Sequence, residues 1–235
     1  MKNTDYHQLR ETVRNRNYEK DSPPSRVVMV ITNKCNLDCY FCFQDRKTLP
    51  NAMKTEDWIK FLDTLETNSH LTITGGEPLL FKGFEKIFIH AAKRHTINLI
   101  CNGTFLTKKF VEILLSTKNF KVLSISIDTI GNTNRDVKPA QYERMKESLN
   151  YFKTLRNKLG HKAIFDTKTV VIDDNARDLF KIYKHCKEEL NSDTHSFQFL
   201  KGSDLQHSDT MSDMEEMFKP SAAPVYENIE IIYPQ

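Results

Sequence analysis

The chain alternates between short apolar runs and longer segments in which apolar residues recur every three or four positions. Short apolar runs rich in β-branched residues are typical of strands, and the longer periodic segments are typical of helices that bury one face. The predicted strands cover residues 26–31, 71–74, 97–101, 122–128, 163–172 and 195–200. The predicted helices cover residues 55–66, 83–95, 107–116, about 140–159 and 175–190.

Strands that alternate with helices in this order predict parallel strands joined by crossover helices. A complete barrel of this kind takes about eight units and about 250 residues, whereas this chain of 235 residues offers six units. The sequence therefore predicts an α/β fold, a partial (β/α)6 TIM-like barrel of parallel strands with outer helices. Ligands should bind where the loops converge at the carboxyl ends of the strands.

The two ends of the chain lack the alternation. We expect a charged N-terminal extension at residues 1–25, a barrel domain at 26–200 and a C-terminal segment at 201–235. The last segment is polar and interrupted by proline, so it is expected to be the start of a cover or a truncated accessory region. Its stretch 225–234 is predicted to be a strand that pairs with an exposed sheet edge, in this chain or in a second copy.

Composition narrows the class of protein. The chain is 39% hydrophobic and 28% charged, which is typical of a globular protein with a real core. With 34 basic and 31 acidic residues, the charge is too balanced to indicate a nucleic-acid-binding surface. No apolar run has the length of a membrane span or of a signal-peptide core. We therefore expect a cytoplasmic protein that binds neither nucleic acid nor membrane, with its oligomeric state left open.

Cysteine spacing supplies the candidate chemistry. Cys35, Cys39 and Cys42 form a C-x3-C-x2-C cluster, while Cys101 and Cys186 are isolated and are expected to be small buried residues. An odd number of cysteines is a poor disulfide framework and favours metal chemistry in a reducing compartment. A structural zinc site needs four ligands, so Cys101 or a histidine would have to complete one. A [4Fe–4S] cluster held by three thiolates keeps one iron open to another ligand, as catalysis requires.

Two motifs in series resemble those of a known family. The segment CNLDCYFC (35–42) follows the first predicted strand, with Phe41 in its aromatic position and Tyr40 beside it. The segment TITGGEPLL (72–80) follows the second predicted strand. Together they resemble the radical SAM superfamily, over roughly residues 26–200. The resemblance implies that the three cysteines ligate a [4Fe–4S] cluster whose open iron binds S-adenosylmethionine (SAM). One-electron cleavage of SAM then yields a 5′-deoxyadenosyl radical that takes a hydrogen atom from a substrate.

The second motif has its own expected roles. Gly75 and Gly76 let the backbone approach a ligand closely, and Pro78 stiffens the turn. An ordinary strand–helix turn would also use such residues. The resemblance implies that this motif binds the methionine ammonium of SAM, and the Glu77 carboxylate is a suitable acceptor for that group.

Further positions of the resemblance lie at the ends of the third and fourth predicted strands. Asn102 in ICNGTFLT is expected near the cofactor, although an Asn-Gly turn explains it equally well. Ser126 and Asp128 in SISID are expected to bond the ribose hydroxyls or the methionine carboxylate region, although one-sided polar alternation is an equal alternative. Lys138 or Arg135 is expected to meet the SAM carboxylate.

The fourth-strand end is most similar to superfamily members that modify peptides and small metabolites. Many of these carry a C-terminal extension with further cysteines for auxiliary clusters, of the SPASM or twitch type, and no cysteine follows Cys186 here. The implied partners are a peptide or small-molecule substrate and an electron donor such as flavodoxin or ferredoxin. Alternatives are an activase of glycyl-radical enzymes or a non-catalytic zinc or iron–sulfur module. No catalytic acid, base or hydrogen donor is assigned from the sequence.

Overall fold

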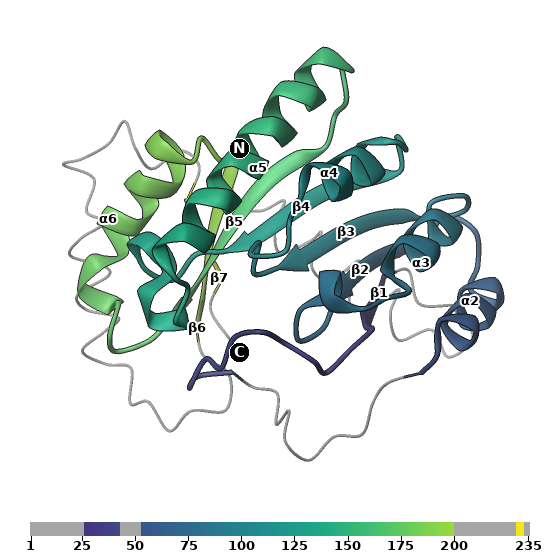
Figure 1. Ribbon diagram of the computed structural model, residues 1–235, viewed down its shortest axis with the longest axis horizontal. Coiled ribbons are helices and arrows are strands. Elements are labelled where there is room, and N and C mark those ends of the chain that lie inside the picture. The colour runs from purple at the N-terminus through teal and green to yellow at the C-terminus, as the bar shows by residue number, and fades with distance from the viewer. Residues whose placement is uncertain (1–25, 43–52, 200–228, 233–235) are drawn as a thin grey trace, which may run out of the picture.

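A parallel sheet forms the centre of the molecule. The computed structural model describes residues 26–42, 53–199 and 229–232. In this part of the chain seven strands pair in the order of the sequence (Figure 1). They are β1 (Arg26–Val30), β2 (His70–Thr74), β3 (Thr96–Cys101), β4 (Phe120–Ser126), β5 (Ile164–Val171), β6 (Thr194–Phe199) and β7 (Ile229–Ile232).

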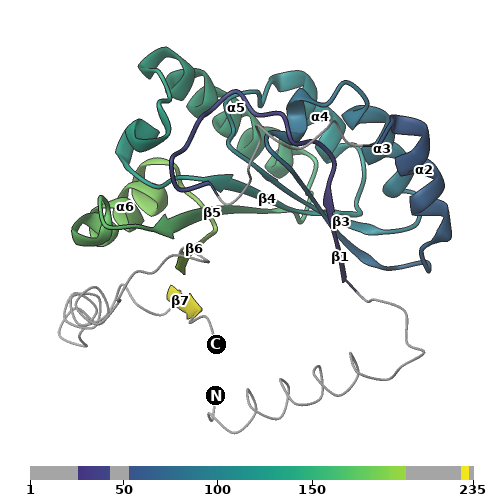
Figure 2. The same cartoon turned by 90° about the horizontal axis from the view of Figure 1, so that it is seen from below.

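The helices cover one face of this sheet. Figure 2 shows the strands as an arch with the helices along its outer side. The helices are α2 (Thr55–Thr64), α3 (Phe84–Ala91), α4 (Lys108–Leu115), α5 (Pro139–Lys158) and α6 (Leu179–Lys184). Aromatic contacts tie the two layers together, because the ring centroids of Phe88 in α3 and Phe120 in β4 lie 5.8 Å apart. Within the described ranges, no helix has the length and apolar character needed to cross a bilayer.

The predicted architecture is confirmed. The fold is an α/β partial barrel, and each of the six predicted strands is found with its ends shifted by at most two residues. The predicted helix at 175–190 is divided into a 3₁₀ turn at Ala176–Asp178, α6, and a π-helical turn at His185–Glu189. The predicted helices at 55–66 and 83–95 end earlier, at Thr64 and Ala91.

The predicted pairing of the C-terminal stretch is confirmed for residues 229–232. They form β7, which pairs in parallel with β6 of the same sheet, with Ile231 opposite Phe197. The predicted extension at 1–25 and the segment at 200–228 lie outside the described residues.

Candidate cofactor-binding site

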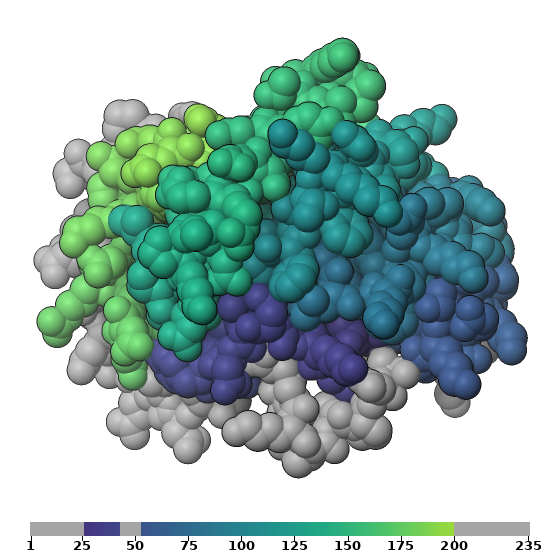
Figure 3. All heavy atoms as spheres, viewed as in Figure 1, coloured from purple at the N-terminus to yellow at the C-terminus, as the bar shows by residue number. Residues whose placement is uncertain are grey.

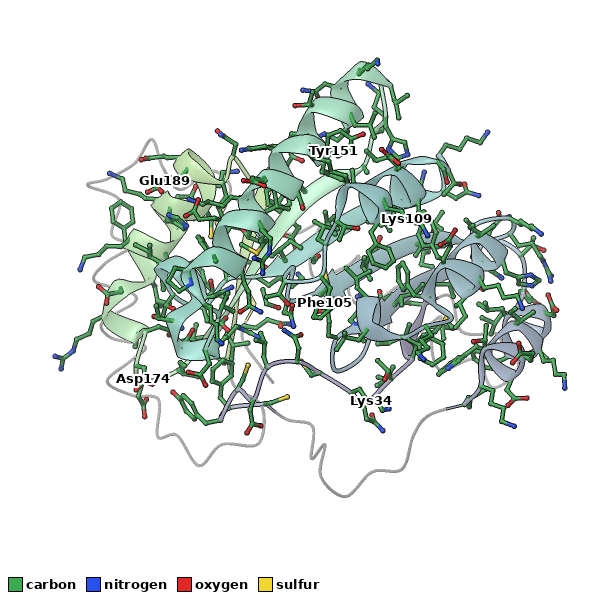
Figure 4. All side chains as sticks on the ribbon, in the orientation of Figure 1. Lys34, Phe105, Lys109, Tyr151, Asp174 and Glu189 are labelled. Atoms are coloured by element: carbon green, nitrogen blue, oxygen red, sulfur yellow. The ribbon has the colours of Figure 1, made fainter. Side chains whose placement is uncertain are left out.

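The cysteine loop, residues 31–42, crosses the carboxyl ends of four neighbouring strands. It begins directly after β1 and is bonded in turn to the segments that follow β2, β3, β4 and β5. The four contacts are Glu77 N–H to Lys34 O, Asn36 Nδ2 to Thr104 Oγ1, Arg135 Nη1 to Cys39 Sγ and Tyr40 Oη to Asp174 Oδ2. Figure 3 shows residues 26–42, in purple, at the molecular surface, and Figure 4 places Lys34 and Asp174 along the same edge.

Two of the cysteine sulfur atoms face hydrogen-bond donors. Cys35 Sγ accepts bonds from the Leu37 amide at 3.5 Å and from Asn102 Nδ2 at 3.7 Å. Cys39 Sγ accepts a bond from Arg135 Nη1 at 3.7 Å. Donors aimed at sulfur stabilise negative charge on it, and metal ligation requires the thiolate. The donor set on this loop therefore fits a thiolate-bound iron–sulfur cluster.

The two glycines of the second motif are explained by the cysteine loop itself. A Cβ added at Gly75 would lie 2.5 Å from Thr32 O, and one at Gly76 would lie 2.3 Å from Lys34 O. The backbones are also bonded, since Gly76 N–H donates to Thr32 O at 2.7 Å. We expected these glycines to allow close approach to a ligand. In the structure the close approach is to the backbone of the loop, so the two motifs form one unit.

Glu77 is buried at the centre of this unit. Its side chain has no exposed surface, and burial raises the pKa of its carboxyl to about 7. Oε1 accepts the Leu79 amide at 3.0 Å, and Oε2 accepts the Asn102 amide at 2.8 Å. The expected bond of this carboxylate to the SAM ammonium stays a prediction. In the structure the carboxylate joins the turn that starts at Pro78 to the end of β3. Its position makes it a positioning residue for that turn.

Asn102 connects the end of β3 to the cysteine loop. Its Nδ2 donates to Cys35 Sγ and, at 3.1 Å, to Asn36 Oδ1. Its Oδ1 accepts bonds from the amide and the hydroxyl of Thr104, as in a local turn. The predicted turn is therefore present, shaped by one side of the amide, while the other side reaches Cys35, a candidate ligand. The expected position of Asn102 near the cofactor stays a prediction.

The end of β4 carries the second buried carboxylate of the site. Asp128 is fully buried, its Oδ1 accepts the Val170 amide at 2.6 Å, and its Oδ2 forms an ion pair with Arg135. Burial raises the pKa of the Asp128 carboxyl, and the Arg135 guanidinium opposes that rise. In the structure this carboxylate holds Arg135. The expected bonds to the ribose hydroxyls or the methionine carboxylate region stay a prediction. Ser126 is half-buried, and its carbonyl accepts a bond from Asn132 Nδ2.

Arg135 is the cation that the structure brings to the cysteine loop. Its guanidinium lies 5.2 Å from the centroid of the Phe41 ring, in addition to its bonds to Asp128 and Cys39. Lys138, the other predicted candidate, is exposed at the residue that caps α5. The two cations are three positions apart, but they face different surroundings.

Tyr40 and Phe41 have different environments although they are adjacent. Phe41 is buried and meets the Tyr40 ring edge-to-face, with centroids 5.1 Å apart. Tyr40 is 68% exposed, and its hydroxyl donates to Asp174 at 2.6 Å. Partial burial and this bond raise the pKa of Tyr40 to about 12. Phe41 therefore fastens the loop to the core, while Tyr40 ties it to the segment after β5.

Two buried asparagines of the site went unnoticed in the sequence. Asn132 Oδ1 accepts the Asp128 amide at 2.9 Å, and Asn175 Nδ2 donates to Asp128 O at 2.9 Å. Both side chains are fully buried and fix the loops that follow β4 and β5. Asparagine is common in surface turns, so neither residue carried a signal that distinguished it.

The described residues contain no group of three Cys, His, Asp or Glu side chains arranged around a single metal ion. Cys101, a possible fourth zinc ligand, is buried in β3, and burial together with the charge of Glu77 raises its thiol pKa well above the usual value. Cys186 is buried as well, and burial raises its thiol pKa to about 12. Both thiols are therefore held in the neutral form, as expected for isolated structural cysteines.

The sequence of the chain is similar to those of known proteins. Residues 29–186 match the family described as the Radical SAM superfamily. Sporulation killing factor maturation protein SkfB of Bacillus subtilis is 34% identical over 136 residues, which are 56% of this chain and 33% of that protein.

Two solved structures of SuiB from Streptococcus suis have similar folds. One, bound to S-adenosylmethionine, has a TM-score of 0.70 and covers 100% of this chain and 57% of that one. The other, bound to the precursor peptide SuiA, has a TM-score of 0.71, and the match covers 98% of this chain and 53% of that one. Both are 18% identical to this chain, so the likeness shows the fold alone. The chain thus spans about a third of SkfB and just over half of SuiB.

Proposed function

Because the chain belongs to the Radical SAM superfamily, whose members use a [4Fe–4S] cluster and SAM, we propose that it carries the cofactor-binding part of a peptide-modifying enzyme. The cofactors supply one-electron cleavage of SAM to a 5′-deoxyadenosyl radical, which takes a hydrogen atom from the substrate. The protein supplies ligands, orientation and exclusion of water.

The residues of the site divide these tasks. Cys35, Cys39 and Cys42 are the proposed cluster ligands. Arg135 stabilises the thiolate of Cys39, and Asn102 does the same for Cys35. The remaining predicted cofactor contacts divide by burial. Those at least partly exposed are proposed to contact the cofactors: Tyr40, Gly75, Gly76, Ser126 and Lys138. Those that are buried are proposed to position the contacting groups: Phe41, Glu77, Pro78 and Asp128.

One observation carries the proposal. The cysteine loop and the Gly-Gly-Glu-Pro turn, which are far apart in the sequence, are bonded backbone to backbone at the carboxyl ends of β1 and β2. Those ends are where α/β barrels bind ligands and place their chemistry. A cysteine loop that only had to close a zinc tetrahedron would not need a second motif whose two glycines let it pack against the loop backbone.

A peptide is the proposed substrate class. SkfB is named for maturation of a killing factor, and SuiB was solved with a precursor peptide bound. Both likenesses favour peptide modification over the modification of a small metabolite. An electron donor such as flavodoxin or ferredoxin is the proposed source of the electron.

The experiment is anaerobic reconstitution of the chain with iron and sulfide, followed by SAM and dithionite. We expect about four irons and four sulfides per chain and release of 5′-deoxyadenosine, measured by mass spectrometry. Alanine at Cys35, Cys39 or Cys42 should abolish both, whereas Cys186→Ala should retain both. A colourless protein with one zinc would indicate a non-catalytic module. Full iron content and SAM cleavage in any of the three cluster variants would overturn the ligand assignment.

A further inference from the structure

Each of the strands β5 and β6 has two faces, one toward the helices and one toward the inner side of the arch. His195 of β6 contacts Tyr183 of α6, with ring centroids 5.8 Å apart, so this position faces the helices. The next residue, Ser196, therefore faces the inner side, because successive side chains alternate across a strand. Lys168 of β5 lies opposite Ser196 in the register and shares its face.

A band of polar side chains crosses the inner side of β4, β5 and β6. Lys168 Nζ lies 3.1 Å from Asp166 Oδ2 and 3.1 Å from Ser196 Oγ. Asp166 also accepts bonds from Ser124 Oγ at 2.8 Å and from Thr194 Oγ1 at 2.7 Å. We call these five residues the inner polar band.

Stability does not explain this band. The interior of a complete barrel of this kind is usually filled by branched apolar side chains. Replacing a buried ion pair by well-packed apolar residues is often neutral or stabilising. Asp166 is only 6% exposed, and three groups donate to its carboxylate. A carboxylate with both oxygens bonded costs less to bury, and it holds Lys168 in one position, as a binding site requires.

Lys168 retains capacity for one more partner. An ammonium group has three N–H donors, and the described residues Asp166 and Ser196 take two of them. The Lys168 side chain is 28% exposed, so an incoming oxygen can reach the third. Because Asp166 balances the charge of Lys168, the pair favours a neutral acceptor such as a carbonyl over a carboxylate or phosphate.

The band adjoins the candidate cofactor site. Lys168 lies opposite Ser126 at the carboxyl end of β4, and its carbonyl accepts the Ile127 amide at 2.8 Å. We propose that Lys168, held by Asp166 and Ser196, is a substrate-binding residue that receives a backbone carbonyl oxygen of the peptide. This inference rests on the proposed function and adds the group of the substrate that is recognised.

The test uses the full reconstituted chain and a panel of synthetic, C-terminally amidated peptides that includes the precursor peptide SuiA. The readout is the peptide concentration that half-maximally stimulates 5′-deoxyadenosine formation. Lys168→Met keeps the length of the side chain but removes the donors, and it should raise this concentration by about ten-fold or more, the effect of a lost charged hydrogen bond. Ser196→Ala should raise it by about two- to ten-fold and replaces Lys168→Met if that variant does not fold. Lys162→Met, at an exposed position before β5, should match the parent.

The results distinguish a carbonyl from a carboxylate as the recognised group, and a substrate contact from a cofactor contact. The ten-fold effect should persist when Asp and Glu in the peptide are replaced by Asn and Gln, and its loss would mean that a carboxylate is recognised instead. An unchanged half-maximal concentration in Lys168→Met overturns the proposal, as does weakened SAM binding measured by calorimetry, which would make Lys168 a cofactor contact. If none of the peptides stimulates the parent, the peptide assignment is wrong. A parent without cluster or SAM cleavage would instead refute the proposed function.

Discussion

The ends of β2 and β4 each bury a carboxylate, yet the two carboxylates have different partners. Glu77, after β2, accepts bonds from the backbone amides of Leu79 and Asn102. Asp128, after β4, accepts one backbone amide and forms an ion pair with Arg135. Both side chains have no exposed surface.

This difference assigns two functions to the same chemical group. Backbone amides carry only partial charges, so burial dominates at Glu77 and raises the pKa of its carboxyl to about 7. That carboxylate fastens two backbone segments together. At Asp128 the guanidinium offsets part of the cost of burial, and the carboxylate aims Arg135 at Cys39 and Phe41. The first carboxylate shapes the site, and the second positions a cation within it.

The largest expected effect comes from breaking the ion pair. Asp128→Ala leaves Arg135 mostly buried without its carboxylate and should lower the free energy of unfolding by about 3–5 kcal/mol, measured by urea denaturation. Asp174→Ala is the matched control, because it removes an exposed carboxylate after the neighbouring strand, and it should cost less than about 1 kcal/mol. Equal effects of the two substitutions would contradict the role given to Asp128.

Glu77→Gln should produce a pH-dependent effect. The pKa of the folded state, about 7, lies above the reference value of 4.5, so the native protein holds a proton that the unfolded chain releases. This contribution to stability is complete below pH 4.5 and is lost as the pH rises to 7, by about 1.4 kcal/mol per pH unit. The stability difference between parent and variant should therefore fall by up to roughly 3 kcal/mol over this range.

Urea unfolding at several pH values measures this difference. The control Glu66→Gln, at an exposed position, should show no such slope. A Glu77→Gln difference that stayed constant from pH 4.5 to 7 would show that folding does not raise the pKa of the Glu77 carboxyl.

The smallest expected effect concerns the contact between the Arg135 guanidinium and Cys39 Sγ. Arg135→Gln should make the reduction potential of the reconstituted cluster more negative, because positive charge and hydrogen bonds near the sulfur atoms favour the reduced form. The expected shift is on the order of 50 mV, as a charged hydrogen bond of about 1.5 kcal/mol corresponds to such a one-electron change. Lys138→Gln removes the same charge at an exposed position and should leave the potential unchanged in an EPR-monitored titration. Equal shifts would mean that only total charge matters, not the bond to Cys39.

Local patterns predicted the elements of the fold well. Apolar periodicity located each of the six strands, and the cysteine spacing located the loop after β1, because both signals depend on residues that are close in sequence. The helix at 175–190 was predicted less accurately, since apolar spacing does not distinguish an α-helical turn from the π-helical turn at His185–Glu189.

The candidate site was predicted in its residue types but not in its contacts. The sequence placed Asn102, Ser126 and Asp128 at strand ends, and the structure finds them there. It could not rank Arg135 above Lys138, because both are cations in the same segment. Lys168 and Asp166 read as ordinary strand residues, since their importance depends on the neighbouring strands that surround them.

By itself the sequence determined the strand–helix alternation, the parallel sheet and the three-cysteine loop. Each of these follows from the spacing of residues that are close together in the sequence. Only the tertiary structure decided which polar group meets which. Arg135 and Cys39 are 96 positions apart, and the contact between them depends on where β1 and β4 end in the sheet. Burial of Glu77 and the inner polar band have the same origin, because desolvation and hydrogen-bond partners are set by segments that are distant in the chain.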